Sequence, residues 1–343
     1  IGLHMVGHIS KSNMFERFLH SQVIGALILI ATTAIALIWA NSTWGQYYYD
    51  LSHTYLGVQF GDAEFKLTLS YWIKDGLMAI FFFVVGLEIK REIVVGELSS
   101  VDKAMLPVCA ALGGAVVPAG IYAWLNMGGE GATGWGIPMA TDIAFALGVL
   151  ALFGKRVPIA LKVFLTALAI ADDLLAVAVI AIFYTPDMNV GMLALALLTV
   201  GLMVLASRMG VRATWVYALL AFIVWIDVLG SGVHATIAGV LVAMVIPVRP
   251  SIDPGEFMDT ASSLLDKARG EDNSLDALIH DAERRNNLSQ LALTVEDAIP
   301  PATALEHRLH PVQSLVILPL FALFSAGVAF SAENLEGFPT SVS

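Results

Sequence analysis

The sequence predicts an all-α polytopic membrane protein, and three observations lead to this fold class. Hydrophobic residues make up 57% of the 343 positions and charged residues only 14%, with a mean hydropathy of +0.77. Nine apolar runs, most of them close to the roughly 20 residues that a spanning helix needs, follow one another along the chain. A single long stretch is hydrophilic. A soluble protein with a packed core and a solvated surface does not have this composition.

The first eight runs fill most of residues 21–248, after a polar tail at residues 1–20. Because the first run is long enough to span and is followed by further spans, we interpret it as a retained helix and not as a cleaved signal. A ninth helix at residues 311–331 follows the hydrophilic loop 249–310 and precedes a polar tail at residues 332–343. The eight expected spans lie at about residues 21–40, 71–89, 104–125, 134–154, 158–184, 190–207, 213–229 and 233–248.

Between the first two spans, hydrophobic and polar residues alternate at 58–60 and at 65–69, on either side of Gly61 and Asp62. Alternation around a turn signal is typical of a β-hairpin. We expect a small external hairpin at about residues 55–70.

Charge sets the expected orientation. Of the 18 Lys and Arg residues, 15 fall in one set of loops and Lys66 alone in the other set, so the positive-inside rule predicts a cytoplasmic amino terminus. Loop 249–310 holds twelve acids and six bases, which accounts for −6 of the net charge of −11. The imbalance therefore belongs mostly to a solvated loop, and we expect a lipid bilayer and no nucleic acid as partner. Cys109 has no second cysteine, which excludes a disulfide framework.

Acidic residues inside the spans carry the functional hypothesis. Asp172 and Asp173 lie near the centre of the fifth run, and ionised carboxylates at that depth are costly unless they line a cavity or hold a cation. Asp142 lies in the fourth run, directly after Thr141 and shortly after Pro138, which interrupts a helix and frees backbone carbonyls. A hard cation such as sodium or lithium binds oxygen ligands of this kind, whereas transition metals prefer Cys or His.

The same carboxylates also bind protons, so a proton and a sodium ion would compete for one site. Alternate exposure of such a site to the two sides of the membrane gives antiport. Asp75 lies one turn inside the outer end of the second span, where a structural role and a place in the ion path are both open. Asp227, near the outer end of the seventh span, is expected to be interfacial.

Two other classes stay open at this point. Two buried acids could activate water in an intramembrane aspartyl protease, although the Gly-x-Gly-Asp pattern of that class is absent. A cation channel or a sodium-coupled symporter is the other alternative, and a cluster of polar residues for a larger substrate is not visible.

Four motifs resemble the NhaA family of sodium/proton antiporters, and the likeness runs from the first span to the ninth. They are GLEIKRE at 86–92, GIPMATDIAFALG at 136–148, AIADDL at 169–174 and SGVHAT at 231–236. The resemblance implies a secondary transporter without a resident cofactor, which exchanges cytoplasmic sodium or lithium for external protons by alternating access, in an electrogenic and pH-regulated way. It also implies a bacterial inner-membrane location and a homodimer formed through the external hairpin.

The resemblance assigns roles residue by residue. Asp172 and Asp173 resemble the carriers of the transported sodium ion and proton, Thr141 and Asp142 support them, and Asp75 belongs to the ion path. The residues associated with the response to pH are Glu88, Glu92, His234, Glu306, His307 and His310. Histidine suits this task because its charge changes near neutral pH.

The family is an example of inverted repeats with discontinuous helices at the midplane of the bilayer. It has twelve spans, whereas nine are visible here, so we expect the second inverted repeat to be incomplete and the chain as written to show no exchange by itself. The excess length of the 249–310 loop is not explained by the resemblance.

Overall fold

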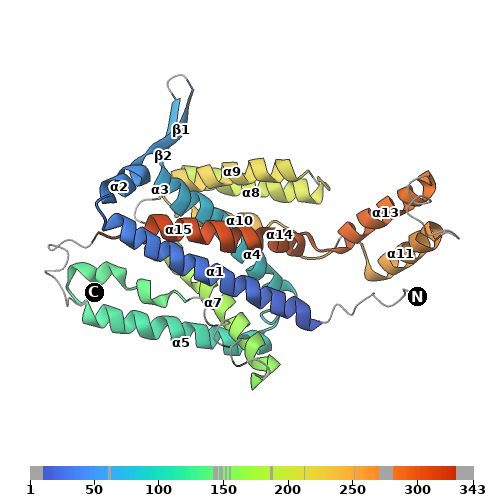
Figure 1. The fold of residues 1–343 in the computed structure, drawn as a ribbon, viewed down its shortest axis with the longest axis horizontal. Helices are drawn as coiled ribbons and strands as arrows, with labels where there is room; N and C mark the ends of the chain where they lie inside the picture. Colours follow the sequence, from blue (N-terminus) through green and yellow to red (C-terminus); the bar gives the residue numbers. More distant parts are fainter. Residues whose placement is uncertain are drawn as a thin grey trace.

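The computed structural model describes residues 11–60, 63–141, 146, 150, 153, 156–185, 188–211, 213–250, 252–269 and 281–329, most of which are helical (Figure 1). A two-stranded sheet accompanies the helices, so the all-α class with a small hairpin is confirmed. The elements are α1 (Lys11–Ala40), α2 (Gly45–His53), β1 (Tyr55–Phe60), β2 (Ala63–Thr68), α3 (Leu69–Tyr71), η1 (Trp72–Leu77), α4 (Met78–Val94), α5 (Val101–Leu125), η2 (Glu130–Gly134), η3 (Ile137–Met139), α7 (Ile159–Phe183), α8 (Val190–Arg208), α9 (Thr214–Gly230), α10 (Thr236–Ala243), α11 (Pro254–Ala268), α13 (Ala282–Ala298), α14 (Pro301–Val312), η5 (Gln313–Ile317) and α15 (Leu318–Ser325).

The helices pack in pairs. α1 lies along α15 through the middle of the bundle, with α5 and α7 on one side and α8 and α9 on the other (Figure 1). α10 packs against both α4 and α9, and α4 also contacts α7. A buried apolar cluster that includes Val224, Val228 and Met203 fills the space between α4, α8, α9 and α10. The helix that carries Asp172 is thus joined to this core through α4.

Four described helices are long and apolar enough to cross a membrane, or five if the bent pair α1 and α2 counts as one span. The four are Val101–Leu125, Val163–Phe183, Val190–Arg208 and Pro301–Ser325. Three more expected spans have shorter helices: α9 has 17 residues, α10 has eight, and α4 is preceded by the π-helical η1. Ten of the 21 residues of the fourth expected span fall outside the described residues.

Small residues bring α4 and α10 into close contact. A Cβ atom on Gly239 would lie 2.0 Å from the carbonyl oxygen of Ala79, and one on Gly86 would lie 2.7 Å from the Cβ of Ala243. At the end of the contact, Lys90 Nζ donates hydrogen bonds to the carbonyls of Met244 and Ile246, just after α10 ends. Glycine at such positions permits the close approach of backbones that membrane helices use for packing.

The hairpin forms as the alternating pattern predicts. β1 and β2 pair antiparallel from Tyr55 opposite Thr68 to Phe60 opposite Ala63, with two residues left for the turn. A Cβ on Gly57 would lie 2.0 Å from the carbonyl oxygen of Phe65. The side chains of Tyr55 and Val58 are exposed. The hairpin projects away from the helices (Figure 1).

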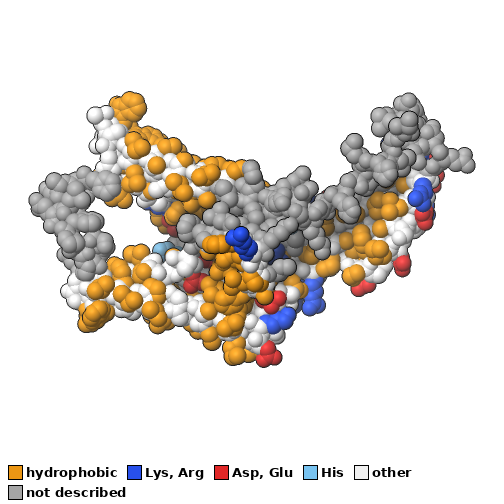
Figure 2. Space-filling view, turned by 60° about the horizontal axis from the view of Figure 1, so that its bottom comes forward, with side chains coloured by type: hydrophobic (Ala, Val, Ile, Leu, Met, Phe, Trp, Pro, Cys, Tyr) orange, Lys and Arg blue, Asp and Glu red, His pale blue; other side chains and the backbone are white. Residues whose placement is uncertain are grey.

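The long hydrophilic segment contains helices of its own. α11 and α13 pack on each other. They project from the end of the molecule that lies opposite the hairpin (Figure 1). α14 begins at Pro301, ten residues before the ninth apolar run, and continues through η5 into α15. Figure 2 shows apolar side chains over much of the visible face, with charged side chains gathered towards the end that carries α11 and α13.

Candidate functional site

Asp172 is buried on α7, with 4% of its surface exposed, next to the buried residues Ile170 and Ala171. Its carboxylate has a specific partner from another segment: the hydroxyl of Thr141 donates a hydrogen bond of 2.5 Å to Asp172 Oδ2. A hydrogen bond to a buried carboxylate partly offsets the free energy lost when the charge leaves water. The structure therefore brings together two of the residues that the sequence singles out.

The backbone before Thr141 is not α-helical. After the short 3₁₀ turns η2 and η3, Ala140 is extended, with φ of −70° and ψ of 134°. Glycine and proline in this stretch interrupt a continuous helix, as the sequence predicts, and an interrupted helix leaves carbonyl oxygens without helical partners. Asp142 lies outside the described residues.

Asp173 follows Asp172 directly but faces other neighbours. Consecutive residues of an α-helix are turned by about 100° about its axis, so the two carboxylates leave the helix in different directions. Asp173 is more exposed than Asp172 and interacts electrostatically with Glu88 on α4. The pair thus connects two regions: Thr141 and the non-helical segment on one side, and the acidic end of α4 on the other.

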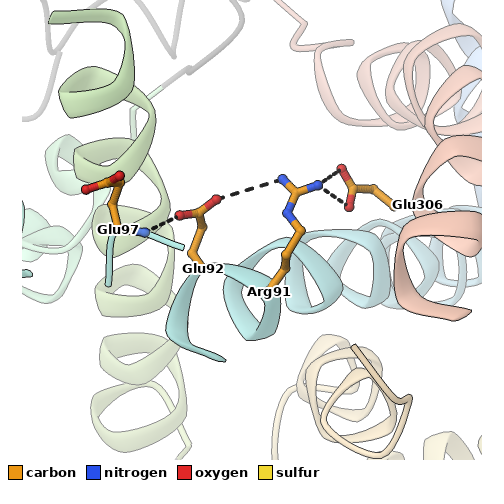
Figure 3. Close-up of polar contacts among 4 residues, drawn as sticks. All are labelled: Arg91, Glu92, Glu97 and Glu306. Carbon is orange, nitrogen blue, oxygen red and sulfur yellow. Dashed lines mark hydrogen bonds and ion pairs between the residues drawn. The ribbon is translucent and has the colours of Figure 1, made fainter. Parts of the chain in front are cut away.

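Arg91 is the centre of that acidic region (Figure 3). Its guanidinium donates two hydrogen bonds of 2.9 Å to the carboxylate of Glu306 on α14, and lies 3.9 Å from a carboxylate oxygen of Glu92. The other oxygen of Glu92 accepts a hydrogen bond from the backbone N–H of Glu97. Glu88 is close enough to Arg91, Glu92 and Glu306 for their charges to act on it.

Two of the predicted histidines join this region from α14. His310 is close enough to Glu306 and His307 for each to affect its charge. The structure therefore gathers five of the six residues predicted for a pH response, from helices more than 200 positions apart in the sequence. We call Glu88, Arg91, Glu92, Glu306, His307 and His310 the acidic cluster.

His234 lies apart from the acidic cluster. It follows the turn between α9 and α10 and is an electrostatic neighbour of Asp75 on η1. The backbone carbonyl of Asp75 accepts a hydrogen bond of 3.3 Å from Trp225 Nε1 on α9. Asp75 stands in a π-helical turn, a local structure found frequently at functional sites. The two residues form a second small polar group.

Sequence reasoning missed three features. It found neither the contact of Arg91 with Glu306 on α14 nor that of Lys90 with the carbonyls after α10. It also did not show that the carboxyl of Asp227, expected near the interface, is buried between helices, 4% exposed and 3.4 Å from the hydroxyl of Thr199 on α8. A signal for this contact existed, because a buried carboxyl needs a hydrogen-bond partner and Thr199 is a polar residue within the sixth apolar run. Within the described ranges, no three His, Cys, Asp or Glu residues are grouped as resident metal ligands.

Comparison with known proteins bears on the motifs. Residues 16–343 match the family described as Na+/H+ antiporter 1. The chain belongs to this family. The resemblance drawn from the four motifs is thereby confirmed, and an antiporter is a secondary transporter and not an enzyme, which removes the protease alternative.

Several curated relatives of the antiporter are similar over nearly the whole chain. A Na(+)/H(+) antiporter NhaA of Oleidesulfovibrio alaskensis is 47% identical over 322 residues, which is 94% of this chain and 72% of the relative. The Na(+)/H(+) antiporter NhaA of Acidithiobacillus ferrooxidans is 47% identical over 337 residues, or 96% of this chain and 76% of the relative. One from Sulfurimonas denitrificans is 46% identical over 318 residues, 92% of this chain and 71% of the relative.

Proposed function

We propose that this sodium/proton antiporter exchanges its two ions at Asp172, where the Thr141 hydroxyl meets the carboxylate. The hydrogen bond between these side chains is the observation that carries the proposal. It joins a buried acid to a stretch of chain whose backbone is not helical, and both are sources of oxygen ligands. Family membership supports the exchange of sodium for protons.

The chemistry follows from the ligands. A dehydrated sodium ion is a hard cation and is held by carboxylate, hydroxyl and carbonyl oxygens. We assign these to Asp172, Asp173, Asp142 and Thr141, with carbonyls of the interrupted helix completing the set. When the ion leaves, a proton on the carboxylate removes the buried charge. The site holds one cation or the other, so alternate access to the two sides produces antiport, and we expect lithium to be transported as well.

Regulation by pH is assigned to the acidic cluster and His234. Glu88 is the connecting residue, because its charge acts on Asp173 in one direction and on Glu306 in the other. A change of protonation in the cluster would alter the electrostatic environment of the ion site. Asp75, beside His234, is assigned to the ion path, and the exchange is proposed to be electrogenic.

We propose that the antiporter is a multi-pass protein of the bacterial inner membrane. We also propose that its discontinuous helix lies at the midplane of the bilayer. We place the amino terminus, α11 and α13 in the cytoplasm and the hairpin outside. Support comes from the basic residues of the loops and from the gathering of charged side chains at the end with α11 and α13 (Figure 2). A homodimer through the hairpin is supported by the exposed side chains of Tyr55 and Val58.

The test uses the full chain, by which we mean one with all twelve spans of the family, because nine spans alone are expected to show no exchange. It is placed in everted vesicles that hold a pH gradient, and sodium chloride is added. We expect sodium to dissipate the gradient. Asp172→Asn should abolish this response, because the amide keeps the shape of the side chain but can neither carry a proton nor neutralise the charge of the sodium ion. Asp227→Asn is the matched control, since Asp227 is equally buried but lies on α9. Full exchange by Asp172→Asn would remove the residue from the mechanism.

A further inference from the structure

The hydrogen bond between Thr141 and Asp172 requires that a non-helical segment be held in register with α7. The segment has anchors at its beginning. Tyr184, directly after the last residue of α7, donates a hydrogen bond of 2.9 Å to the carbonyl of Thr133 and accepts one of 2.9 Å from the N–H of Gly136. One phenol hydroxyl thus satisfies two backbone groups of the segment.

The glycines of this segment leave room for tyrosine hydroxyls. A Cβ on Gly136 would lie 2.8 Å from the hydroxyl oxygen of Tyr184, and a Cβ on Gly134 would lie 2.6 Å from that of Tyr122 on α5. Both distances are shorter than a carbon and an oxygen tolerate without displacement. A side chain at either position would therefore push a tyrosine hydroxyl away from the segment.

Apolar contacts hold the same stretch. The ring of Trp135 packs edge-on against Phe183, with centroids 5.2 Å apart, and is tilted against Tyr184 at 6.0 Å. Met139 is 5% exposed and packs with residues of α5 and α7. Polar and apolar contacts thus fix residues 133–139 to α7 at several points before the chain reaches Thr141.

The lengths involved leave little slack. Tyr184 and Asp172 are twelve residues apart on α7, which corresponds to about 18 Å along the helix axis. Gly136 and Thr141 are five residues apart, which covers at most about 17 Å when fully extended and less here, because residues 137–139 form the 3₁₀ turn η3. The segment must run close along α7 from one polar anchor to the other, so a displacement at Gly136 reaches Thr141.

We propose that Tyr184 is a positioning residue for the ion site: its hydroxyl, held on the backbone of Thr133 and Gly136, sets the place of Thr141 opposite Asp172. Tyr184 does not touch the ion. The inference rests on the proposed role of Asp172, and it adds a residue at the far end of α7 to the machinery that determines sodium affinity.

The experiment compares Tyr184→Phe with Tyr217→Phe in the full chain. Each variant removes one hydroxyl and keeps the ring, and the Tyr217 hydroxyl also donates to a backbone carbonyl, that of Val211, in a loop remote from the site. We expect Tyr184→Phe to raise the KM for sodium about three- to tenfold, because one or two hydrogen bonds that orient the segment are lost. The maximal rate should change little. Tyr217→Phe should leave KM unchanged.

A purely structural role would give a different result. If Tyr184→Phe lowers the thermal stability in detergent and leaves the KM for sodium at the parent value, the positioning role is wrong. Asp172→Asn in the same assay separates the two proposals. Exchange by Asp172→Asn would overturn the proposed site, whereas an inactive Asp172→Asn together with a normal KM in Tyr184→Phe would overturn only the role of Tyr184.

A double-mutant cycle with Gly136→Ala adds a second readout. The added methyl group should displace the Tyr184 hydroxyl and raise KM in a chain that still has the tyrosine. Because phenylalanine lacks the oxygen that this methyl group meets first, the double variant should have a KM no higher than that of the worse single variant. A KM equal to the product of the two single effects would mean that the residues act separately, which contradicts the proposal.

Discussion

Among single residues, Thr141 offers the simplest test, because it contacts Asp172 through its hydroxyl. We predict that Thr141→Val, which keeps the shape, raises the KM for sodium about tenfold or more, the effect of losing a hydrogen bond to a charged group worth ~1.5–3 kcal/mol. Thr141→Ser is the control and should be near normal. Sodium-dependent dissipation of a pH gradient measures both, and equal KM values in the two variants would dismiss the hydroxyl as a ligand.

Arg91 provides the second test at this scale. Both hydrogen bonds to Glu306 come from one guanidinium nitrogen, Nη1, while Nη2 lies 3.9 Å from Glu92, so the guanidinium reaches two carboxylates at once. We predict that Arg91→Gln moves the pH dependence of exchange to more alkaline values. Without the positive guanidinium beside them, the neighbouring carboxylates keep their protons to a higher pH. Arg91→Lys should give a smaller shift in the same direction. Exchange rates measured across the pH range would contradict this if the Gln variant kept the parent profile.

Single residues also show what the sequence could not specify. Asp172 and Asp173 stand out in an apolar run, but the sequence does not say which of two adjacent carboxylates faces Thr141, since that depends on the rotation of α7 against the non-helical segment. Arg91 and Glu306 are 215 positions apart and meet only because α4 packs on α14. Asp227 was expected near the end of its span, and the sequence does not show that neighbouring helices bury its carboxyl.

At the scale of elements, the contact between α4 and α10 depends on glycine. We predict that Gly239→Ala costs about 1–3 kcal/mol through overpacking, because the new Cβ meets a backbone carbonyl that cannot move alone. Gly120→Ala on α5 is the matched control, since among the described residues no atom beyond its neighbours and the backbone of its own helix lies within 4 Å of the added carbon. Thermal unfolding in detergent should separate the two variants, and equal melting temperatures would refute the tight contact.

Helices and strands could be predicted where the residues that specify them lie close together in the sequence. The hairpin was found because alternation and a Gly61-Asp62 turn lie within 15 residues. The start of α14 was not, because residues 301–310 are polar and only their packing on α4 makes them part of a helix that continues into α15. The eight-residue α10 is shorter than its apolar run, because the turn at residues 231–235 and the Met244 to Ile246 turn take up both ends.

The whole molecule has two distinct ends, and their sides of the membrane can be tested. With Cys109 replaced by serine, we predict that a cysteine at Ser263 on α11 reacts with a membrane-impermeant maleimide in everted vesicles and not in intact cells. A cysteine at Gln59 on β1 should show the reverse pattern. Both positions are exposed, so access is decided by the side of the membrane alone. Labelling of Ser263→Cys in intact cells would invert the proposed orientation.

The two hydrogen bonds of Lys90 have a consequence for the kinetics of ion capture. Counted along α4, Lys90 and Arg91 balance Glu88 and Glu92, and the region looks neutral. Lys90, however, directs two of its three N–H donors to the uncharged carbonyls after α10, while Glu306 arrives from α14 to occupy Arg91. Lys90 keeps its charge but is held against the end of α10, and Glu88, Glu92 and Glu306 together exceed the two bases by one negative charge when all five are ionised. We predict that this charge concentrates cations locally and speeds their arrival, an effect that salt would screen over a Debye length of about 8 Å at physiological ionic strength.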